Sequence, residues 1–352
     1  MRTGRKRKWH SLIVLNLIIL VIILSGTKDK DIREPDLKIK KGTAIVITGA
    51  AARISQEVAL LEHLYNRGML NDVVFISGAS SGALNAAVLN AILSGKYSWD
   101  EYIAFLGNLK NGDVFIRNGR KLPADTNPLR NLITRVIIDS IGYRNLCDLP
   151  IPTSISVVDL KVLPLKERTF RFCNRKINPE SDSSLNIVDV LMASTAIPIA
   201  FPPARISNIK TIRDVPYHDG GVASDHVPFQ ALIEFEKYMG IEVEKMIIVS
   251  RKRDSMINLA GELEQFGIDR INFFNKYNVF PDALTNRGFI NRLKDIQKES
   301  PSLAQRTFVY APEFDEDFLL LDFSTLKKQY EVTAEWAKTH DPVPLNEYLQ
   351  RW

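Results

Sequence analysis

The feature that most constrains this chain is a strand, a glycine-bounded turn and a helix predicted in succession between residues 73 and 93. Val73 to Ile76 has the short apolar pattern of a buried strand, and Ala83 to Leu93 that of a helix. The turn between them, Gly78-Ala79-Ser80-Ser81-Gly82, fits G-x-S-x-G. Such a sharp turn strains its central serine and closes only if the residues two before and two after are small. We therefore expect Ser80 at the tip of the turn, between the elbow glycines Gly78 and Gly82, with its hydroxyl at the start of the helix.

The order of the predicted elements indicates an α/β fold. A β-branched run at Thr43 to Thr48 predicts a strand before the turn, and apolar residues at helical spacing follow between Val58 and Leu64. Strand–helix–strand–helix order implies a mostly parallel central sheet flanked by helices, with its ligand site at the carboxyl ends of the strands. Further strands are expected at Thr153–Leu160, Thr169–Phe172, Met246–Ser250 and Thr307–Tyr310, and further helices at Ile187–Ser194, Phe229–Tyr238 and Thr325–Lys338.

The rhythm of strands and helices also suggests the domain organisation. No linker is evident within 42–352, so this range is expected to form a single domain. Segments near 96–150 and 252–300 interrupt the pattern and are interpreted as insertions over the sheet. Residues 27–41 are rich in charge and are interpreted as a tether to the N-terminal segment.

Residues 1–26 have the pattern of a targeting segment. A basic cluster precedes an apolar run from Leu12 to Leu24, interrupted by Asn16 alone, and Ser25 and Gly26 follow. This arrangement is typical of a signal peptide or an uncleaved signal-anchor, and the sequence does not separate the two. The expected location is membrane-associated, or secreted or periplasmic after cleavage.

Charge and cysteine content exclude several classes of function. Five of the 46 basic residues lie in the first ten positions, and the remaining 41 equal the 41 acidic residues. The net charge of +5 therefore belongs to the N-terminus and gives no support to nucleic-acid binding. The two cysteines, Cys147 and Cys173, match no zinc site and are interpreted as buried thiols, with one disulfide as the alternative. No metal constellation is evident, and no cofactor is expected.

A base and an oxyanion-binding loop are needed for a serine nucleophile. Asp219 lies at the end of a predicted strand and is followed by Gly220 and Gly221. A β-turn is the alternative interpretation, because Asp-Gly is a common turn dipeptide. Upstream, the first strand closes on small residues from Gly49 to Ala52, whose backbone N–H groups could face a substrate oxygen.

Taken in order, these stations resemble the patatin-like phospholipase family. The resemblance covers roughly residues 42 to 250 and rests on GAAARI at 49–54, GASSG at 78–82, DGG at 219–221 and the segment 193–203, which is similar to the family segment before the catalytic aspartate. Four stations in the right order are more specific than any one of them. The family implies a patatin-like three-layer sandwich that hydrolyses lipid esters without a cofactor.

The resemblance also assigns roles to individual residues. It implies that Ser80 attacks the ester carbonyl, that Asp219 accepts its proton, and that an acyl-enzyme is then hydrolysed by water. It places the oxyanion hole at the amides of Gly49, Ala50 and Ala51, with Arg53 as the basic residue of that loop. The implied substrate is a phospholipid or another acyl-ester lipid at a membrane surface.

The chain departs from the family in its oxyanion loop, which is normally G-G-G-x-R-G. Alanine keeps the N–H donor but resists φ > 0, so a weakened hole and a slow hydrolase are expected. Two alternatives stay open. One is an α/β-hydrolase-type esterase with a Ser-Asp-His triad, for which His340 lies late in the chain and His218 and His226 lie near Asp219. The other is a non-catalytic lipid-binding protein with the same fold.

Aromatic side chains are frequent among basic residues between 266 and 293. This mixture is typical of an interfacial lid that meets lipid headgroups. Aromatic residues of a capping helix that face the core would give the same pattern.

Overall fold

The computed structural model describes residues 38–119, 121–162, 165–207, 215–254, 261–262 and 281–352. The predicted targeting segment 1–26 and most of the predicted tether lie outside these residues. Residues Ile39–Trp352 form one compact unit, with β1 beginning at Lys38, inside the stretch interpreted as a tether. Within the described ranges, no helix combines the length and apolar character needed to cross a bilayer.

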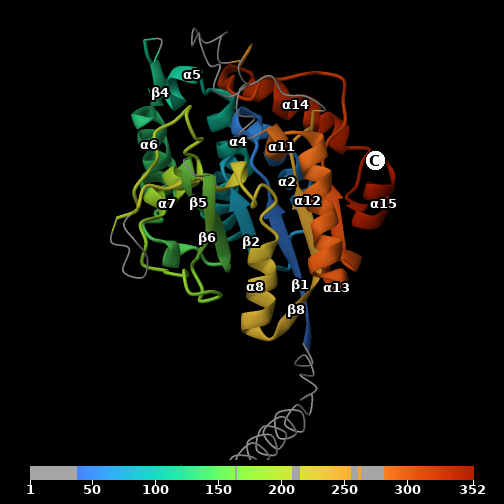
Figure 1. Ribbon diagram of the computed structural model, residues 1–352. Coiled ribbons are helices and arrows are strands. Elements are labelled where there is room, and N and C mark those ends of the chain that lie inside the picture. Colours follow the sequence, from blue (N-terminus) through green and yellow to red (C-terminus); the bar gives the residue numbers. More distant parts are fainter. Residues whose placement is uncertain (1–37, 120, 163–164, 208–214, 255–260, 263–280) are drawn as a thin grey trace, which may run out of the picture. The chain divides into compact units, whose positions relative to one another are not determined.

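The unit is built on an eight-stranded, mostly parallel sheet (Figure 1). Its strands are β1 Lys38–Ile47, β2 Val73–Ala79, β5 Thr153–Val162, β6 Leu165–Cys173, β7 His218–Asp219, β8 Ile241–Val249, β9 Thr307–Tyr310 and β10 Val343–Pro344. The order is β10-β9-β8-β1-β2-β5-β6, and β7 pairs with β5 outside that path. The pairs β1–β2, β2–β5 and β8–β9 are parallel, whereas β6 and β10 add antiparallel edges. The predicted α/β class and all six predicted strands are confirmed.

Both faces of the sheet are buried, each under its own apolar cluster. Successive side chains of a strand point to opposite faces and therefore belong to different clusters. In β1, Ile45 and Ile47 belong to one apolar cluster, and Ala44 and Val46 belong to the other. The first cluster packs against α2 Ile54–Asn66, α3 Ser81–Leu93, α7 Ile187–Ser194 and α14 Leu326–Ala337. The second packs against α8 Gln230–Met239, α12 Asn286–Glu299, α13 Pro301–Gln305 and α15 Leu345–Gln350. The result is a three-layer α/β/α arrangement, as the resemblance implied.

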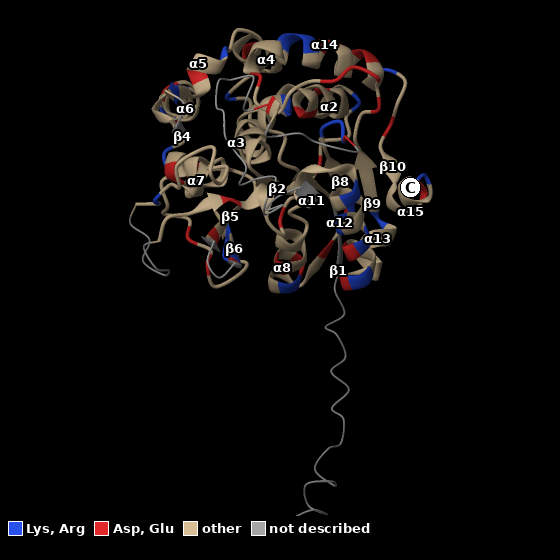
Figure 2. Ribbon diagram, turned by 45° about the horizontal axis from the view of Figure 1, so that its top comes forward, with Lys and Arg blue, Asp and Glu red and all other residues tan. Residues whose placement is uncertain are grey.

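Segment 96–150 lies between α3 and β5 and is mostly helical. It contains α4 Trp99–Gly107, α5 Asn111–Val114, the separate hairpin β3 Ile116–Asn118 and β4 Lys121–Asp125, α6 Asn127–Ile133, the π-helical turn η2 Thr134–Ser140 and the 3₁₀ turn η3 Leu146–Asp148. A capping box fixes the start of α4, because Ser98 accepts from the Glu101 N–H and the Glu101 carboxylate accepts from the Ser98 N–H. Residues of α4, α6 and η2 belong to the same apolar cluster as those of α3, and Figure 2 shows α4 and α6 near α3.

Segment 252–300 is described at 252–254, 261–262 and 281–300, which includes α11 Pro281–Leu284 and the whole of α12. Phe289 of α12 is fully buried and packs edge-on against Tyr348, so this aromatic residue faces the core and does not belong to an exposed lid. Phe266, Phe273, Phe274, Tyr277 and Phe280 lie outside the described residues.

The outer helices carry both signs of charge, and so does the edge strand β6, whereas β2 carries no charged residue (Figure 2). This mixture agrees with the equal numbers of acidic and basic residues beyond the first ten positions. Cys173 is buried as predicted, but the prediction is wrong for Cys147, which is exposed on the short turn η3; both thiols are free.

Candidate active site

Strand register brings Ser80 and Asp219 together. β2 pairs with β5 up to the pair Ala79–Ser156, and the next residue of β5, Val157, pairs with Asp219 of β7. β7 therefore occupies the place beside β5 that β2 leaves when the chain turns at Ser80. Nucleophile and candidate base meet at the carboxyl end of β2, where an α/β sheet is expected to bind its ligand.

The turn at Ser80 has the strained geometry of a nucleophile elbow. Ser80 has φ 57° and ψ −133°, an uncommon combination for any residue but glycine. A Cβ on Gly78 would meet the Gly82 carbonyl, and a Cβ on Gly82 would meet the carbonyl of Thr48. The turn therefore closes only with glycine at both positions, as the sequence predicted. Ser80 immediately precedes α3, so the helix N-terminus favours negative charge beside its hydroxyl.

Ser194 anchors this turn and was not singled out from the sequence. Its Oγ accepts the Ser80 N–H at 3.0 Å and donates to the Ser156 carbonyl at 2.8 Å. Ser194 thus links the elbow to β5. Its place in the segment 193–203 was the available signal, but only the pairing of distant segments shows what it does.

Asp219 is almost completely buried, with 1% of its surface exposed. Burial raises its pKa to about 7, against the opposing effects of hydrogen bonds from the Ser80 hydroxyl and the Gly221 N–H. The Gly221 N–H donates to Asp219 Oδ1 at 2.7 Å and fixes the carboxylate. A Cβ on Gly220 would collide with the Ser156 carbonyl, so that glycine lets the chain pass β5. A carboxylate with a pKa near neutrality can accept a proton from a serine.

Three of the four predicted oxyanion-loop residues line the pocket that contains Ser80 and Asp219. This catalytic pocket has a volume of about 30 Å³ and is lined by Gly49, Ala50 and Ala51. A Cβ on Gly49 would lie 3.0 Å from Ser80 Cβ, which explains why this position is glycine. The Ala50 N–H already donates to Ser81 Oγ at 2.8 Å. Gly49 and Ala51 are therefore the loop residues left to offer an N–H to a substrate oxygen.

The backbone of the two alanines differs from the expectation at one position. Ala51 has φ 47°, in the left-handed region, whereas Ala50 has an ordinary φ of −129°. The predicted strain is thus present at Ala51 and absent at Ala50. A left-handed alanine costs roughly 1–2 kcal/mol.

Arg53, which the resemblance placed in the oxyanion hole, does not line the catalytic pocket. Its guanidinium donates to the Phe318 carbonyl at 2.8 Å and to Asp254 at 2.5 Å. The neighbouring Ala52 N–H donates to the Leu320 carbonyl at 2.8 Å. Arg53 therefore ties the loop to the segment 318–321, whose Leu320 and Leu321 form one wall of the pocket.

Arg251 lines the catalytic pocket and was not expected from the sequence. Its side chain is fully buried, and it donates to the carbonyls of Lys252 and Leu284 at 2.8 Å each. Burial lowers the pKa of Arg251 well below its usual value, and the positive charges of Arg253 and Arg53 lower it further. A guanidinium stays charged in proteins. Arg251 therefore supplies positive charge to the wall of the pocket, and its Nε has no hydrogen-bond partner among the described atoms.

A histidine-based triad finds no support in the geometry. None of the histidines that the structure describes, at 63, 218, 226 and 340, lines the catalytic pocket. His226 lies with its ring nitrogens 3.0 and 3.2 Å from the carbonyls of Ala223 and Gly288. His340 is exposed and stacks on Trp336. His218 is the neighbour of Asp219 on β7 and pairs with Val158. Because adjacent residues of a strand face opposite sides of the sheet, the His218 side chain points away from the side that Asp219 faces.

Comparison with known proteins decides the family. The profile of the family described as patatin-like phospholipase matches residues 45–233, more than half of the chain. The chain belongs to this family. Membership implies lipid acyl-hydrolase activity. No curated protein matches the sequence closely.

Two solved structures are similar to this member of the family. One is VipD from Legionella pneumophila, with 11% identity and a TM-score of 0.33, covering 89% of this chain and 72% of VipD. The other is the type III effector protein ExoU, with 13% identity and a TM-score of 0.41, covering 89% of this chain and 54% of ExoU. The chain thus spans about half the length of ExoU.

Proposed function

We propose that the chain hydrolyses carboxylic esters of lipids through a Ser80–Asp219 dyad. The Ser80 hydroxyl gives its proton to the Asp219 carboxylate as its oxygen attacks the ester carbonyl. The developing oxyanion accepts from the Ala51 N–H, beside the N-terminus of α3. Collapse of the tetrahedral intermediate expels the alcohol, which takes the proton from Asp219. Water then hydrolyses the acyl-enzyme in the same sequence of steps.

One observation carries this proposal: the strained Ser80 and the buried Asp219 share a small pocket with the oxyanion loop. The pKa of about 7 for Asp219 suits a general base at neutral pH, because the ideal catalytic pKa lies near the working pH. The apolar side chains Ile197, Val222 and Leu284 in the same lining suit a lipid substrate. Phospholipid is the class of substrate that family membership favours.

Labelling with a fluorophosphonate probe tests the nucleophile directly. We expect one labelled residue, Ser80, and loss of labelling in Ser80→Ala. Mapping of the label distinguishes Ser80 from its neighbour Ser81, whose hydroxyl accepts the Ala50 N–H. Undiminished ester turnover in a folded Ser80→Ala variant would remove Ser80 from the mechanism. A folded wild-type protein that neither takes the label nor hydrolyses any ester would favour the non-catalytic alternative.

We further propose that residues 1–26 direct the catalytic unit to a membrane, where its substrate lies. The basic cluster and apolar run support this proposal. Fractionation of cells that express the full chain tests it, with a chain that starts at Asp36 as the control. We expect the full chain in the membrane fraction, or the mature chain outside the cytoplasm. A full-length chain found wholly in the soluble cytosolic fraction would refute the targeting.

A further inference from the structure

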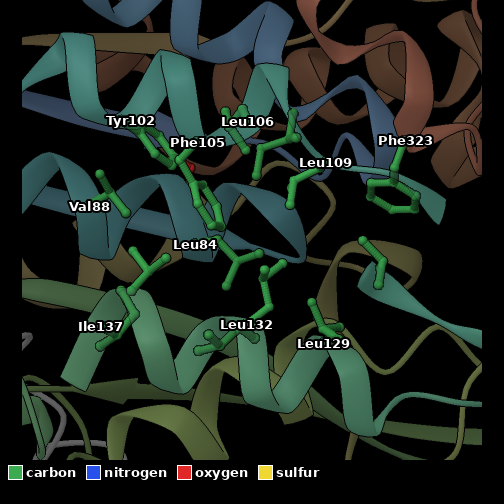
Figure 3. Close-up of a pocket in the computed structure, with 14 residues that line it drawn as sticks. Leu84, Val88, Tyr102, Phe105, Leu106, Leu109, Leu129, Leu132, Ile137 and Phe323 are labelled. Atoms are coloured by element: carbon green, nitrogen blue, oxygen red, sulfur yellow. The ribbon is translucent and has the colours of Figure 1, made fainter. Parts of the chain in front are cut away.

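A second cavity lies along α3, outside the catalytic pocket. Its walls come from α3 and α4 on one side and from α6 and the π-helical turn η2 on the other (Figure 3). Figure 3 shows Val88 and Ile137 at one end, Leu109 and Phe323 at the other, and Leu84 between them. The cavity has a volume of about 60 Å³.

The lining of this cavity is apolar throughout. Thirteen of its 14 residues are Ile, Leu, Val or Phe, and the other is Tyr102. The Tyr102 hydroxyl donates to Asn85 Oδ1 at 2.7 Å, so its polar atom is already satisfied. An apolar cavity gives water too few hydrogen-bond partners and accepts hydrocarbon instead. A lipid headgroup would find no lining side chain here with a free polar group.

Three of the chain segments that line the catalytic pocket also supply residues to this cavity. Ala51 lines the catalytic pocket, and Ile54, three residues later, lines this cavity. Leu321 lines the catalytic pocket, and Phe323, two residues later, lines this cavity. Along α3, Leu84 and Val88 come four and eight residues after Ser80, so they share the helix face that begins at the nucleophile. At a rise of 1.5 Å per residue, this face extends about 12 Å from Ser80 to Val88.

We infer that this cavity, between α3, α4 and α6, holds the acyl chain of the substrate while Ser80 attacks its carbonyl. The inference rests on the proposed esterase function. One water-sized group needs about 10–15 Å³ of such volume, so the cavity takes roughly four to six of them. The catalytic pocket, about 30 Å³, takes the carbonyl carbon and its neighbours. A chain of medium length, such as octanoyl, matches these two volumes together.

Filling the cavity tests this assignment. Val88→Phe places a ring into the cavity from the α3 wall, and Val136→Phe does so from η2 in case the first variant does not fold. Ile103→Phe is the matched control, because Ile103 lines a different hollow, of about 130 Å³, between α2, α4 and α14. The readout is the ratio of kcat/KM for p-nitrophenyl octanoate to that for p-nitrophenyl acetate. Acetate has no chain for the cavity to bind.

We expect the ratio to fall at least tenfold in Val88→Phe and Val136→Phe and to stay at the wild-type value in Ile103→Phe. Each methylene moved from water into an apolar site changes an affinity about fourfold, so a few lost methylenes suffice. An unchanged ratio in the folded cavity-filling variants, or an equal fall in Ile103→Phe, would overturn the assignment.

A binding measurement separates this inference from the proposed function. If the wild-type protein hydrolyses neither ester, the esterase proposal fails, and calorimetric binding of octanoate decides the role of the cavity. In that case, fatty-acid binding that is lost in the Val88→Phe variant but kept in the Ile103→Phe variant supports a chain-binding cavity. Binding that Val88→Phe leaves unchanged overturns it.

Discussion

Replacing Asp219 with asparagine should slow turnover strongly and, at neutral pH, make the folded protein more stable. The carboxylate is 1% exposed, and burial raises its pKa to about 7 from an ordinary value of 3.8. Ionising it inside the fold is therefore unfavourable. Asparagine keeps an acceptor oxygen for the Gly221 N–H, but it can neither ionise nor take a proton from Ser80.

The size of the effect follows from the two pKa values. Between pH 3.8 and about 7, the folded state holds more protons at this site than the unfolded state does. The free energy of unfolding therefore falls as the pH rises through that window and levels off above it. A gap of about 3 pH units, at about 1.4 kcal/mol per unit, corresponds to about 4 kcal/mol. The free energy of unfolding of Asp219→Asn does not fall in this way, because asparagine does not ionise.

Urea unfolding of the wild type and of Asp219→Asn at pH 4, 6 and 8 measures the difference. We expect the advantage of the variant to grow from pH 4 to pH 8 by up to about 4 kcal/mol. Glu57, whose pKa burial raises to about 8, titrates in both proteins and cancels in the comparison. A stability difference that is the same at all three pH values would refute the buried, destabilising carboxylate. In parallel, kcat should fall by about 10²–10⁴.

Three further outcomes follow from the backbone and the charge of the site. The free energy of unfolding, measured with urea, should be about 1–3 kcal/mol higher for Ser80→Gly than for Ser80→Ala, because only glycine relieves the strain at φ 57°. Equal free energies of unfolding would argue against strain. Ala51→Gly should gain about 1 kcal/mol, whereas Ala50→Gly should not, since only Ala51 has a positive φ; a gain at Ala50 instead would reverse this account. In a pH profile, kcat/KM should rise with pH and level off above about 7, as Asp219 loses its proton; activity that is flat from pH 5 to 9 would contradict its role as base.

Local pattern predicted the fold class and the positions of the main elements. The apolar run at Thr307–Tyr310 and the helix at Ile187–Ser194 were predicted with the bounds that the structure has. The elbow was equally visible, because the spacing of Gly78 and Gly82 around Ser80 is a local steric requirement. Such features depend on near neighbours in the chain, which a single sequence displays.

Features that depend on distant partners could not be predicted in the same way. Strand β7 has two residues and no periodicity, so only its pairing with β5 defines it. The family resemblance placed Arg53 in the oxyanion hole, whereas its actual partners, Phe318 and Asp254, lie too far along the chain for the sequence to indicate them. Arg251 stands in a run of charged residues that reads as a solvated surface. Its complete burial arises from elements that pack over the end of β8.

Because β2 and β7 pair with consecutive residues of β5, the proposed dyad can assemble only late during synthesis and folding of the chain. Ser80 and its elbow can form from β1, β2 and α3, which are contiguous early in the sequence. Asp219 reaches its place only after β5 has joined β2 and β7 has then paired with Val157 and Val158. A nascent chain that ends before β7 has its serine but no base. Long-range pairing of this kind is slow compared with helix formation. Under the proposed mechanism, a growing chain therefore cannot hydrolyse esters before residue 219 has been synthesised and β7 has paired with β5.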